Sequence, residues 1–297
     1  MTPAPLRFGI DLGGTKTEGV ILDPDGRERF RERVPTDASS YDAVLAGIER
    51  VYRRMREHAG SAAHTLGIGT PGAVSQRTGL LKNSNTVCMN GMPVARDLRA
   101  RLGRSLALEN DANCFALAEA LHGAGRNKRV VFGVILGTGC GGGIVIDGAV
   151  HRGLQAIAGE WGHTVIDPAG PPCYCGQRGC VETYISGSGI EARYARAYGQ
   201  RLSAQDVITA SRARDPRATA VMDEFFARFG QALANLIAVL DPDIVVLGGG
   251  LSNLDELYAR GVEEVRDRVF SDSLETPIVK HALGDSAGVI GAALIGV

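Results

Sequence analysis

The 297-residue chain has almost no net charge, because 32 Lys and Arg residues are balanced by 33 Asp and Glu residues. Such a chain has no global field to attract nucleic acid or an anionic membrane, so DNA binding would need a local basic patch. No apolar run reaches the roughly 18 residues of a bilayer span, and the segment from Met1 to Leu6 does not resemble a secretory signal. The sequence therefore predicts a cytoplasmic protein with neither membrane nor nucleic-acid partners.

Two nucleotide-binding patterns are missing or incomplete. The P-loop pattern GxxxxGK[ST] is absent. The residues Gly137-x-Gly139-x-x-Gly142 match the dinucleotide pattern GxGxxG, but that pattern needs a helix directly after it, and the run GIVIDG that follows is typical of a strand. P-loop and Rossmann proteins are therefore both disfavoured.

Glycine, in contrast, is abundant. It accounts for 40 of the 297 residues, whereas ordinary usage is roughly 7%. With only 12 prolines and no G-X-Y period, the excess indicates neither collagen nor a low-complexity linker. Several glycines follow apolar strands, where they would let the backbone approach a ligand closely.

The hydrophobic pattern predicts the same block twice. In the first block, strands at 7–12 and 18–22 flank a glycine turn. The block also contains strands near 29–34, at 65–69 and at 105–108, and helices at 41–58, 94–102 and 112–121. From Val130 the order recurs, with strands at 130–136, 143–148 and 243–247 and helices at 203–213, 218–240, 254–269 and 287–294. The repetition predicts a duplicated, two-lobed α/β protein.

Two glycine turns are candidate phosphate loops. The run Gly13-Gly14-Thr15-Lys16 follows Asp11 at the end of the first strand, and Gly137-Thr138-Gly139 opens a run of five glycines in seven residues after the strand that ends at Leu136. Successive glycine N–H groups form a nest that holds an anion. A plain hairpin turn is the alternative, but it needs at most two glycines.

Asp111 stands between an apolar strand and a helix, in the run Glu109-Asn110-Asp111. α/β folds display reactive groups at the carboxyl ends of strands, although an ordinary helix-capping Asp occupies the same kind of position. Two phosphate loops favour the catalytic interpretation, because phosphoryl transfer needs a group that accepts the proton of the attacking hydroxyl.

A zinc site is predicted from one histidine and three cysteines. His163, Cys173, Cys175 and Cys180 have the spacing H-x9-C-x-C-x4-C, and four such ligands suit a closed, structural, tetrahedral site. Free buried thiols or a disulfide are the alternatives, but adjacent C-x-C makes a strained bridge and the chain has no secretory signal. The metal would then fix the loop that presents Glu160.

A third glycine cluster, Gly248-Gly249-Gly250, follows the strand ending at Leu247. It would let a nucleobase lie against the backbone. A close approach of a helix explains it equally well.

Taken together, these segments resemble bacterial sugar kinases of the ROK family, within the actin-like, sugar kinase and Hsp70 superfamily. The resemblance runs nearly end to end, through GIDLGGTKTEGVILD, GIGTPGAV, LKNSN, NDANC, GTGCGGG, GEWGH, CYCGQRGCVE and DPDIVVLGGGLSN. It implies an α/β, actin-like, two-domain fold with duplicated ribonuclease-H-like sheets. Residues 1–118 plus about 285–297 would form the lobe that binds sugar and phosphate, and residues 119–284 would form the lobe with the ATP site and the zinc loop.

The resemblance also implies roles for individual residues. Asp111 is the implied base, and the residues implied to hold the sugar together with it are Gly72, Asn85, Asn110, Glu160, His163 and Glu182. His163 would use its other nitrogen on zinc. Asp11 is implied to hold magnesium-linked water, while phosphates would lie at Gly13, Gly14, Thr15, Lys16, Gly137, Thr138 and Gly139, and adenosine at Gly248, Gly249 and Gly250.

The implied reaction is ATP-dependent phosphorylation of the 6-hydroxyl of a hexose, with Mg²⁺ and a structural Zn²⁺, by a homodimer. The motifs look most like the fructokinase and mannokinase branch, so fructose is the expected substrate, with glucose or N-acetylglucosamine as alternatives. Where that branch commonly has Trp-Leu-Asn-Gly, this chain has Cys88-Met89-Asn90-Gly91. A sugar-sensing transcription regulator of the same family is disfavoured, because the first hairpin begins at about residue 6 and leaves no room for a preceding helix-turn-helix.

Overall fold

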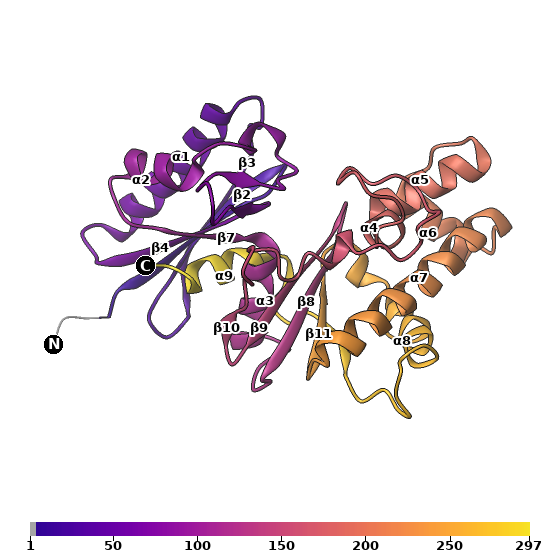
Figure 1. Ribbon diagram of the computed structural model, residues 1–297. Coiled ribbons are helices and arrows are strands. Elements are labelled where there is room, and N and C mark those ends of the chain that lie inside the picture. Colours follow the sequence, from indigo (N-terminus) through magenta and orange to yellow (C-terminus); the bar gives the residue numbers. More distant parts are fainter. Residues whose placement is uncertain (1–3) are drawn as a thin grey trace.

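The computed structural model describes residues 4–297, so the first residues of the expected N-terminal lobe and of the Met1–Leu6 segment lie outside the described part. Two five-stranded sheets of identical topology dominate it (Figure 1). The first sheet has the order β3-β2-β1-β4-β7 and the second the order β10-β9-β8-β11-β12. In each, the first three strands pair antiparallel and the last two join in parallel. The expected duplication is confirmed.

The strands have the following bounds. Those of the first sheet are β1 Leu6–Leu12, β2 Lys16–Leu22, β3 Glu28–Pro35, β4 His64–Thr70 and β7 Ala107–Asn110. Those of the second are β8 Val130–Leu136, β9 Cys140–Ile146, β10 Ala149–Val150, β11 Ile244–Gly248 and β12 Ile278–Lys280. A small separate hairpin consists of β5 Ala73–Val74 and β6 Leu81–Lys82.

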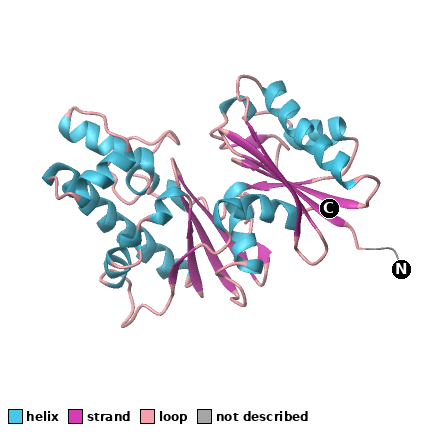
Figure 2. Cartoon of the chain, turned by 180° about the vertical axis from the view of Figure 1, so that it is seen from behind, coloured by secondary structure: helices cyan, strands magenta, loops and turns pink. Residues whose placement is uncertain are grey.

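The helices form three layers around the two sheets. In chain order they are α1 Tyr41–Ala59, α2 Val94–Leu102, α3 Asp111–His122, α4 Glu182–Ile185, α5 Gly187–Tyr198, α6 Ala204–Arg212, α7 Pro216–Leu240, α8 Arg260–Arg266 and α9 Ala287–Leu294. Short 3₁₀ turns lie at η1 Val87–Met89, η2 Trp161–His163, η3 Gly250–Asn253, η4 Asp255–Leu257 and η5 Gly284–Ser286. Figure 2 shows the middle layer, α3 and α9, lying between the two sheets.

Each layer has its own apolar core. Residues such as Phe8 and Ile48 fill the space between the first sheet and α1 and α2, while Phe132 and Phe229 belong to the core under α4 to α8. Between the sheets, α3 packs on β8 and β9, and α9 packs on β1 and β4. Because both faces of each sheet are covered, the central strands are apolar on both sides, which explains their continuous hydrophobic runs. The division of the chain into lobes near residues 118 and 285 stays a prediction.

Small residues allow α3 and α9 to lie close to the strands. A side chain at Gly67 in β4 would collide with the Ala292 carbonyl of α9, and one at Gly143 in β9 would collide with the backbone of α3. This changes the interpretation of the second glycine run. Gly141 to Gly143 lie inside β9, paired with β8, so only the glycines at 137 and 139 belong to the turn. Of the others, Gly143 makes room for α3, whereas a side chain at Gly142 would collide with Phe132 and Trp161.

The predicted elements are found, but one of them is interrupted and several further elements were not predicted. The helix expected at 254–269 is interrupted, because α8 begins only at Arg260, where Gly261 packs against the ring of Phe229. The helices α4 and α5, the strands β10 and β12 and the hairpin β5–β6 were not predicted, and α5 is the longest of these elements. Its start is set by Ser186, whose side chain accepts a hydrogen bond from the N–H of Gly189, an ordinary N-cap that stands in a glycine-rich stretch.

Within residues 4–297, no helix combines the length and the apolar character needed to span a bilayer.

Candidate active site between the lobes

A polar cavity of about 240 Å³ lies at the carboxyl ends of β4, β7 and β8. It brings together most of the residues singled out in the sequence. Its lining includes Gly72, Asn85, Asn110, Asp111, Gly137, Thr138, Gly139, Glu160, His163 and Glu182. Carboxyl ends of parallel strands are where α/β proteins place their ligands. The residues at 13–16 and 248–250 do not line this cavity.

Asp111 is the first residue of α3, and one of its carboxylate oxygens accepts a hydrogen bond of 2.8 Å from the N–H of Ala112. Burial, and after it the negative charge of Glu160, raise the pKa of Asp111 to about 6. Asp111 is therefore a stronger base than an ordinary aspartate, whose pKa is about 3.9. A base whose pKa approaches the working pH transfers protons more efficiently.

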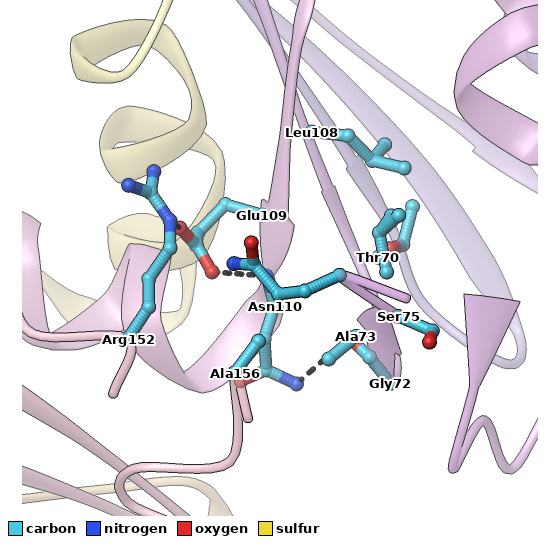
Figure 3. A pocket seen from close by; sticks show the side chains of 11 residues that line it. Thr70, Gly72, Ala73, Ser75, Leu108, Glu109, Asn110, Arg152 and Ala156 are labelled. Atoms are coloured by element: carbon cyan, nitrogen blue, oxygen red, sulfur yellow. Dashed lines mark hydrogen bonds and ion pairs between the residues drawn. The ribbon is translucent and has the colours of Figure 1, made fainter. Parts of the chain in front are cut away.

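Asn110 is the N-cap of α3 and is held from both sides. Its side-chain oxygen accepts hydrogen bonds from the N–H groups of Ala112 (2.9 Å) and Asn113 (3.3 Å), and its amide nitrogen donates to the carbonyl of Gly72 (3.3 Å). Figure 3 shows this last contact from a small separate cavity behind Asn110. The cap fixes both Asn110 and the neighbouring Asp111 in the cleft.

Asp11 is the last residue but one of β1, and one of its carboxylate oxygens has no hydrogen-bond partner among the described residues. Its Oδ1 is buried and has no hydrogen-bond partner in the described chain. Burial, followed by the charges of Asp111 and Glu18, raises the pKa of Asp11 to about 7, while Lys16 lowers it. A buried, unpartnered carboxylate oxygen beside other acids suits a cation or its bound water. The residue therefore fits the expected magnesium role.

The two glycine turns keep free N–H groups. Among residues 4–297, the backbone N–H groups without a protein acceptor in these turns are those of Gly14, Thr15, Thr138 and Gly139. The second turn is rigid, because the carbonyls of Gly137 and Thr138 accept hydrogen bonds from the N–H groups of Gly187 (2.8 Å) and Ser188 (3.2 Å) at the start of α5. Free N–H groups on a fixed turn can hold an anion such as phosphate.

The second half of the cavity comes from the segment that holds the four expected metal ligands. Burial raises the pKa of Glu160, while His163 and Lys82 lower it. Glu182, the first residue of α4, accepts a hydrogen bond of 3.0 Å from the N–H of Cys140. Both carboxylates therefore face the cavity from the same side as His163.

The four expected metal ligands converge. The Sγ of Cys173 lies 3.5 Å from Nδ1 of His163, and the Sγ atoms of Cys175 and Cys180 are 3.6 Å apart. All four ligand atoms lie within 4.8 Å of one another. A tetrahedral zinc with bonds of about 2.0–2.3 Å separates its ligands by roughly 3.5–3.8 Å. The residues fit a structural zinc ion, which would tie the segment at residue 163 to the one at residues 173–180.

Close packing explains Gly72, Gly248 and Gly249 but not Gly250. At Gly72, with a φ of +82°, a side chain would collide with the carbonyl of Lys82. Gly248 packs on the ring of Phe115 and Gly249 on the backbone of Leu136, so close packing accounts for both. Gly250 has open space around its Cα.

Sequence reasoning missed several cavity residues. Tyr174 lies between two of the expected metal ligands, and its hydroxyl is 3.0 Å from Nε2 of His163. Asn83 also lines the cavity. Lys82 donates to the carbonyl of Gln155 across the cleft (2.9 Å), and Arg152 pairs with Glu109. For Tyr174 the sequence offered one signal, an aromatic residue inside C-x-C. For the pairs that Lys82 and Arg152 form across the cleft, it offered none.

Two matching lobes, a cavity lined by carboxylates between them, and free N–H groups on a glycine turn define a phosphotransferase of the actin-like sugar kinase class. Comparison with known proteins agrees. The sequence model of the ROK family matches residues 7–296. This chain therefore belongs to the ROK family.

One curated relative and two solved structures illustrate the similarity. The N-acetyl-D-glucosamine kinase of Pasteurella multocida is 39% identical over 302 residues, which cover 98% of this chain and 99% of the relative. The ROK hexokinase of Thermus thermophilus superposes with a TM-score of 0.88 at 33% identity, covering 98% of this chain and 97% of its own. The ROK glucokinase of Streptomyces griseus, in complex with glucose and AMPPNP, gives a TM-score of 0.81 at 28% identity, covering 98% and 99%. The expected fold and the ATP-dependent sugar kinase activity are confirmed.

Proposed function

We propose that this protein transfers the γ-phosphoryl group of ATP to the 6-hydroxyl of a 2-acetamido hexose, N-acetyl-D-glucosamine being the preferred sugar. The identity with the Pasteurella N-acetyl-D-glucosamine kinase supports this choice over the fructose that the motifs favoured.

The observation that carries the choice of sugar is a second cavity. It continues from the first, sharing Asn83, Glu160, His163 and Tyr174, and has a volume of about 600 Å³. Its further lining includes Val87 and Ile157, two exposed apolar side chains, and Gln177. Asp111 does not line it.

The geometry of a pyranose connects the two cavities. The carbon that carries C6 and the carbon that carries the 2-substituent lie opposite each other in the ring. A sugar whose 6-hydroxyl meets Asp111 therefore directs its 2-substituent away from Asp111, into the second cavity. There, an acetamido group would find a polar residue for its amide and apolar residues for its methyl group.

Asp111 accepts the proton of the 6-hydroxyl as the phosphoryl group is transferred. Glu160, His163 and Glu182 orient the sugar from one side of the cleft, and Asn110, Gly72 and Asn85 from the other. The free N–H groups of the two turns hold the phosphates, and Gly248 to Gly250 lie beside adenosine. Magnesium, held through Asp11, would supply positive charge to the phosphates. Closure of the lobes would exclude water, which competes with the sugar for the phosphoryl group.

A coupled kinase assay tests the proposal with N-acetylglucosamine, N-acetylmannosamine, glucose, mannose and fructose. We expect the highest kcat/KM for N-acetylglucosamine, and a product phosphorylated at O6. Asp111→Asn serves as the inactive control, with turnover lowered by about 10²- to 10⁴-fold. A higher kcat/KM for fructose or for glucose would refute the sugar assignment while leaving the kinase activity intact.

We also propose that two chains form a homodimer. An apolar groove beside α7 is lined by Ile157, Leu236 and Leu240, and next to them Val239 is 90% exposed. Such a patch on a chain without strong charge favours association with a second copy. Light scattering should give twice the chain mass, and Val239→Glu should shift it towards the mass of one chain.

A further inference from the structure

The loop of residues 152–158 leaves the second sheet after β10, reaches across the cleft, and returns to Glu160. It is closed on itself, since the N–H of Ala158 donates to the carbonyl of Arg152 (3.2 Å) and the N–H of Ala156 donates to that of Gly153 (3.3 Å). Ala156 has a φ of +53°, a conformation that costs a residue with a side chain free energy. The loop therefore holds a strained shape that other contacts must maintain.

Two tethers attach this loop to the opposite lobe. The guanidinium of Arg152 pairs with the carboxylate of Glu109 at the end of β7, and Nζ of Lys82 donates to the carbonyl of Gln155 at 2.9 Å. Figure 3 shows the first tether, with Arg152 and Glu109 facing each other above Asn110. Ala156 lines the same small cavity as Gly72. The loop thus adds two side-chain contacts between the lobes, away from the packing of α3 and α9.

Glu109 connects the first tether to the active site. Its side chain is only 6% exposed, whereas that of Arg152 is 50% exposed. The second carboxylate oxygen, Oε1, accepts hydrogen bonds of 2.9 Å from the N–H of Asn110 and from the side-chain amide of Asn113. A buried carboxylate that loses its cation tends to reorganise the groups around it. The orientation of Glu109, and with it that of Asn110, therefore depends on Arg152.

The other end of the loop leads directly to Glu160. Only Gly159 separates Ala158 from Glu160, and the N–H of Glu160 donates to the carbonyl of Ile157 (3.1 Å). Asn110 and Glu160 lie on opposite sides of the cleft and line the same cavity. The loop is thus attached to one sugar-holding residue in each half of the site.

We propose that Arg152 is a positioning residue that couples the two halves of the sugar site through Glu109. The ion pair holds the 152–158 loop on the opposite lobe, so that Asn110 and Glu160 are placed for the sugar before it binds. Arg152 touches neither the sugar nor the phosphates in this role. The proposal rests on the sugar kinase function proposed above.

Arg152→Ala tests the coupling. We expect the KM for N-acetylglucosamine to rise about 10- to 100-fold, as for a small misplacement of binding groups, while the KM for ATP stays unchanged. Trp161 is the single tryptophan of the chain and follows Glu160, so its fluorescence reports sugar binding without turnover. The dissociation constant measured in this way should rise by the same factor as KM. Arg152→Lys should restore part of the affinity.

A double-variant cycle separates positioning from general stability. If Arg152 acts through Glu109, Arg152→Ala combined with Glu109→Gln should bind sugar no more weakly than the worse single variant. The control variant Arg129→Ala removes an exposed ion pair with Asp147, which lies in the turn between β9 and β10. It should leave the sugar affinity unchanged. The melting temperature of each variant shows whether it is folded, and the Lys variant provides the measurement if the Ala variant is not.

Unchanged sugar affinity in Arg152→Ala, or effects that multiply in the double variant, would overturn the coupling. An equal loss of ATP and sugar affinity would do the same, because it would indicate a general structural role. A wild-type enzyme that phosphorylates none of the sugars would instead contradict the proposed function.

Discussion

The carboxylate of Glu182 accepts a hydrogen bond of 3.0 Å from the backbone N–H of Cys140. Glu182 follows Cys180, a proposed zinc ligand, by two residues, and Cys140 follows the second glycine turn. The neighbouring Gly139 has no room for a side chain, since a Cβ there would lie 2.6 Å from the same carboxylate oxygen. One side chain therefore links the zinc loop, the sugar cavity and the phosphate turn.

This link predicts that Glu182→Ala affects both substrates. Loss of a charged acceptor should raise the KM for the sugar about 10- to 100-fold, and the released turn should also raise the KM for ATP. Glu182→Gln keeps a neutral acceptor for Cys140, so it should raise mainly the sugar KM. Initial rates with each substrate varied in turn measure both effects. An Ala variant with an unchanged KM for ATP would show that the turn does not need this link.

The raised pKa of Asp111 predicts the acid limb of the pH profile. Because a base must be deprotonated and its pKa is raised to about 6, kcat/KM should fall below that pH, by about tenfold per pH unit. Glu160→Gln removes one of the charges that raise this pKa, so its limb should move to lower pH. Rates at saturating ATP between pH 5 and pH 8, roughly the range around this pKa, give the profile. A profile that stays flat down to pH 5 would contradict the role of Asp111.

We expect Asp11 to lower the stability of the folded chain near neutral pH and to be needed for the use of Mg²⁺. Its pKa is raised to about 7 in the folded chain, so the folded state holds a proton that the unfolded chain releases, and stability falls as the pH rises towards and through 7. Asp11→Asn should therefore melt at a higher temperature than the wild type at pH 8, by about 2–4 °C for each kcal/mol, and by a smaller margin at pH 5, which lies closer to the ordinary pKa of 3.8. The same variant should need more Mg²⁺ for half-maximal activity. Thermal melts at both pH values and a Mg²⁺ titration test this, and a variant less stable at pH 8 would disprove it.

Removal of the zinc should abolish sugar binding before it unfolds the protein. Cys180→Ser, or a chelator, should lower the metal content from one zinc per chain. The Trp161 fluorescence should then no longer respond to sugar, because the metal that fixes the segments of Glu160, His163 and Glu182 is lost. Cys88→Ser, at a partly exposed thiol away from the four ligands, is the matched control. Full sugar affinity without metal would rule out a structural zinc.

Much of this protein was predictable from local sequence. The repeated order of strands and helices indicated two equivalent lobes, because each apolar run had to be covered and each glycine turn lay between two strands. The convergence of His163, Cys173, Cys175 and Cys180 was predictable because their residue types and spacing serve little other purpose than metal binding. Asn110 and Asp111 were recognisable as the start of a helix, and the resemblance of the motifs to a family indicated the rest of the cavity.

Other features depended on parts of the chain that only folding brings together. Sequence alone could not show that Gly142 makes room for Phe132 and Trp161, and Gly143 for α3, because the groups that approach them lie elsewhere in the chain. It could not give the pKa of Asp111, which depends on burial and on Glu160, 49 residues away. Nor could it pair Arg152 with Glu109. Residue types and spacing determined the chemistry that this chain carries, whereas the distances and burial that tune this chemistry were decided by the packing of the two lobes against each other.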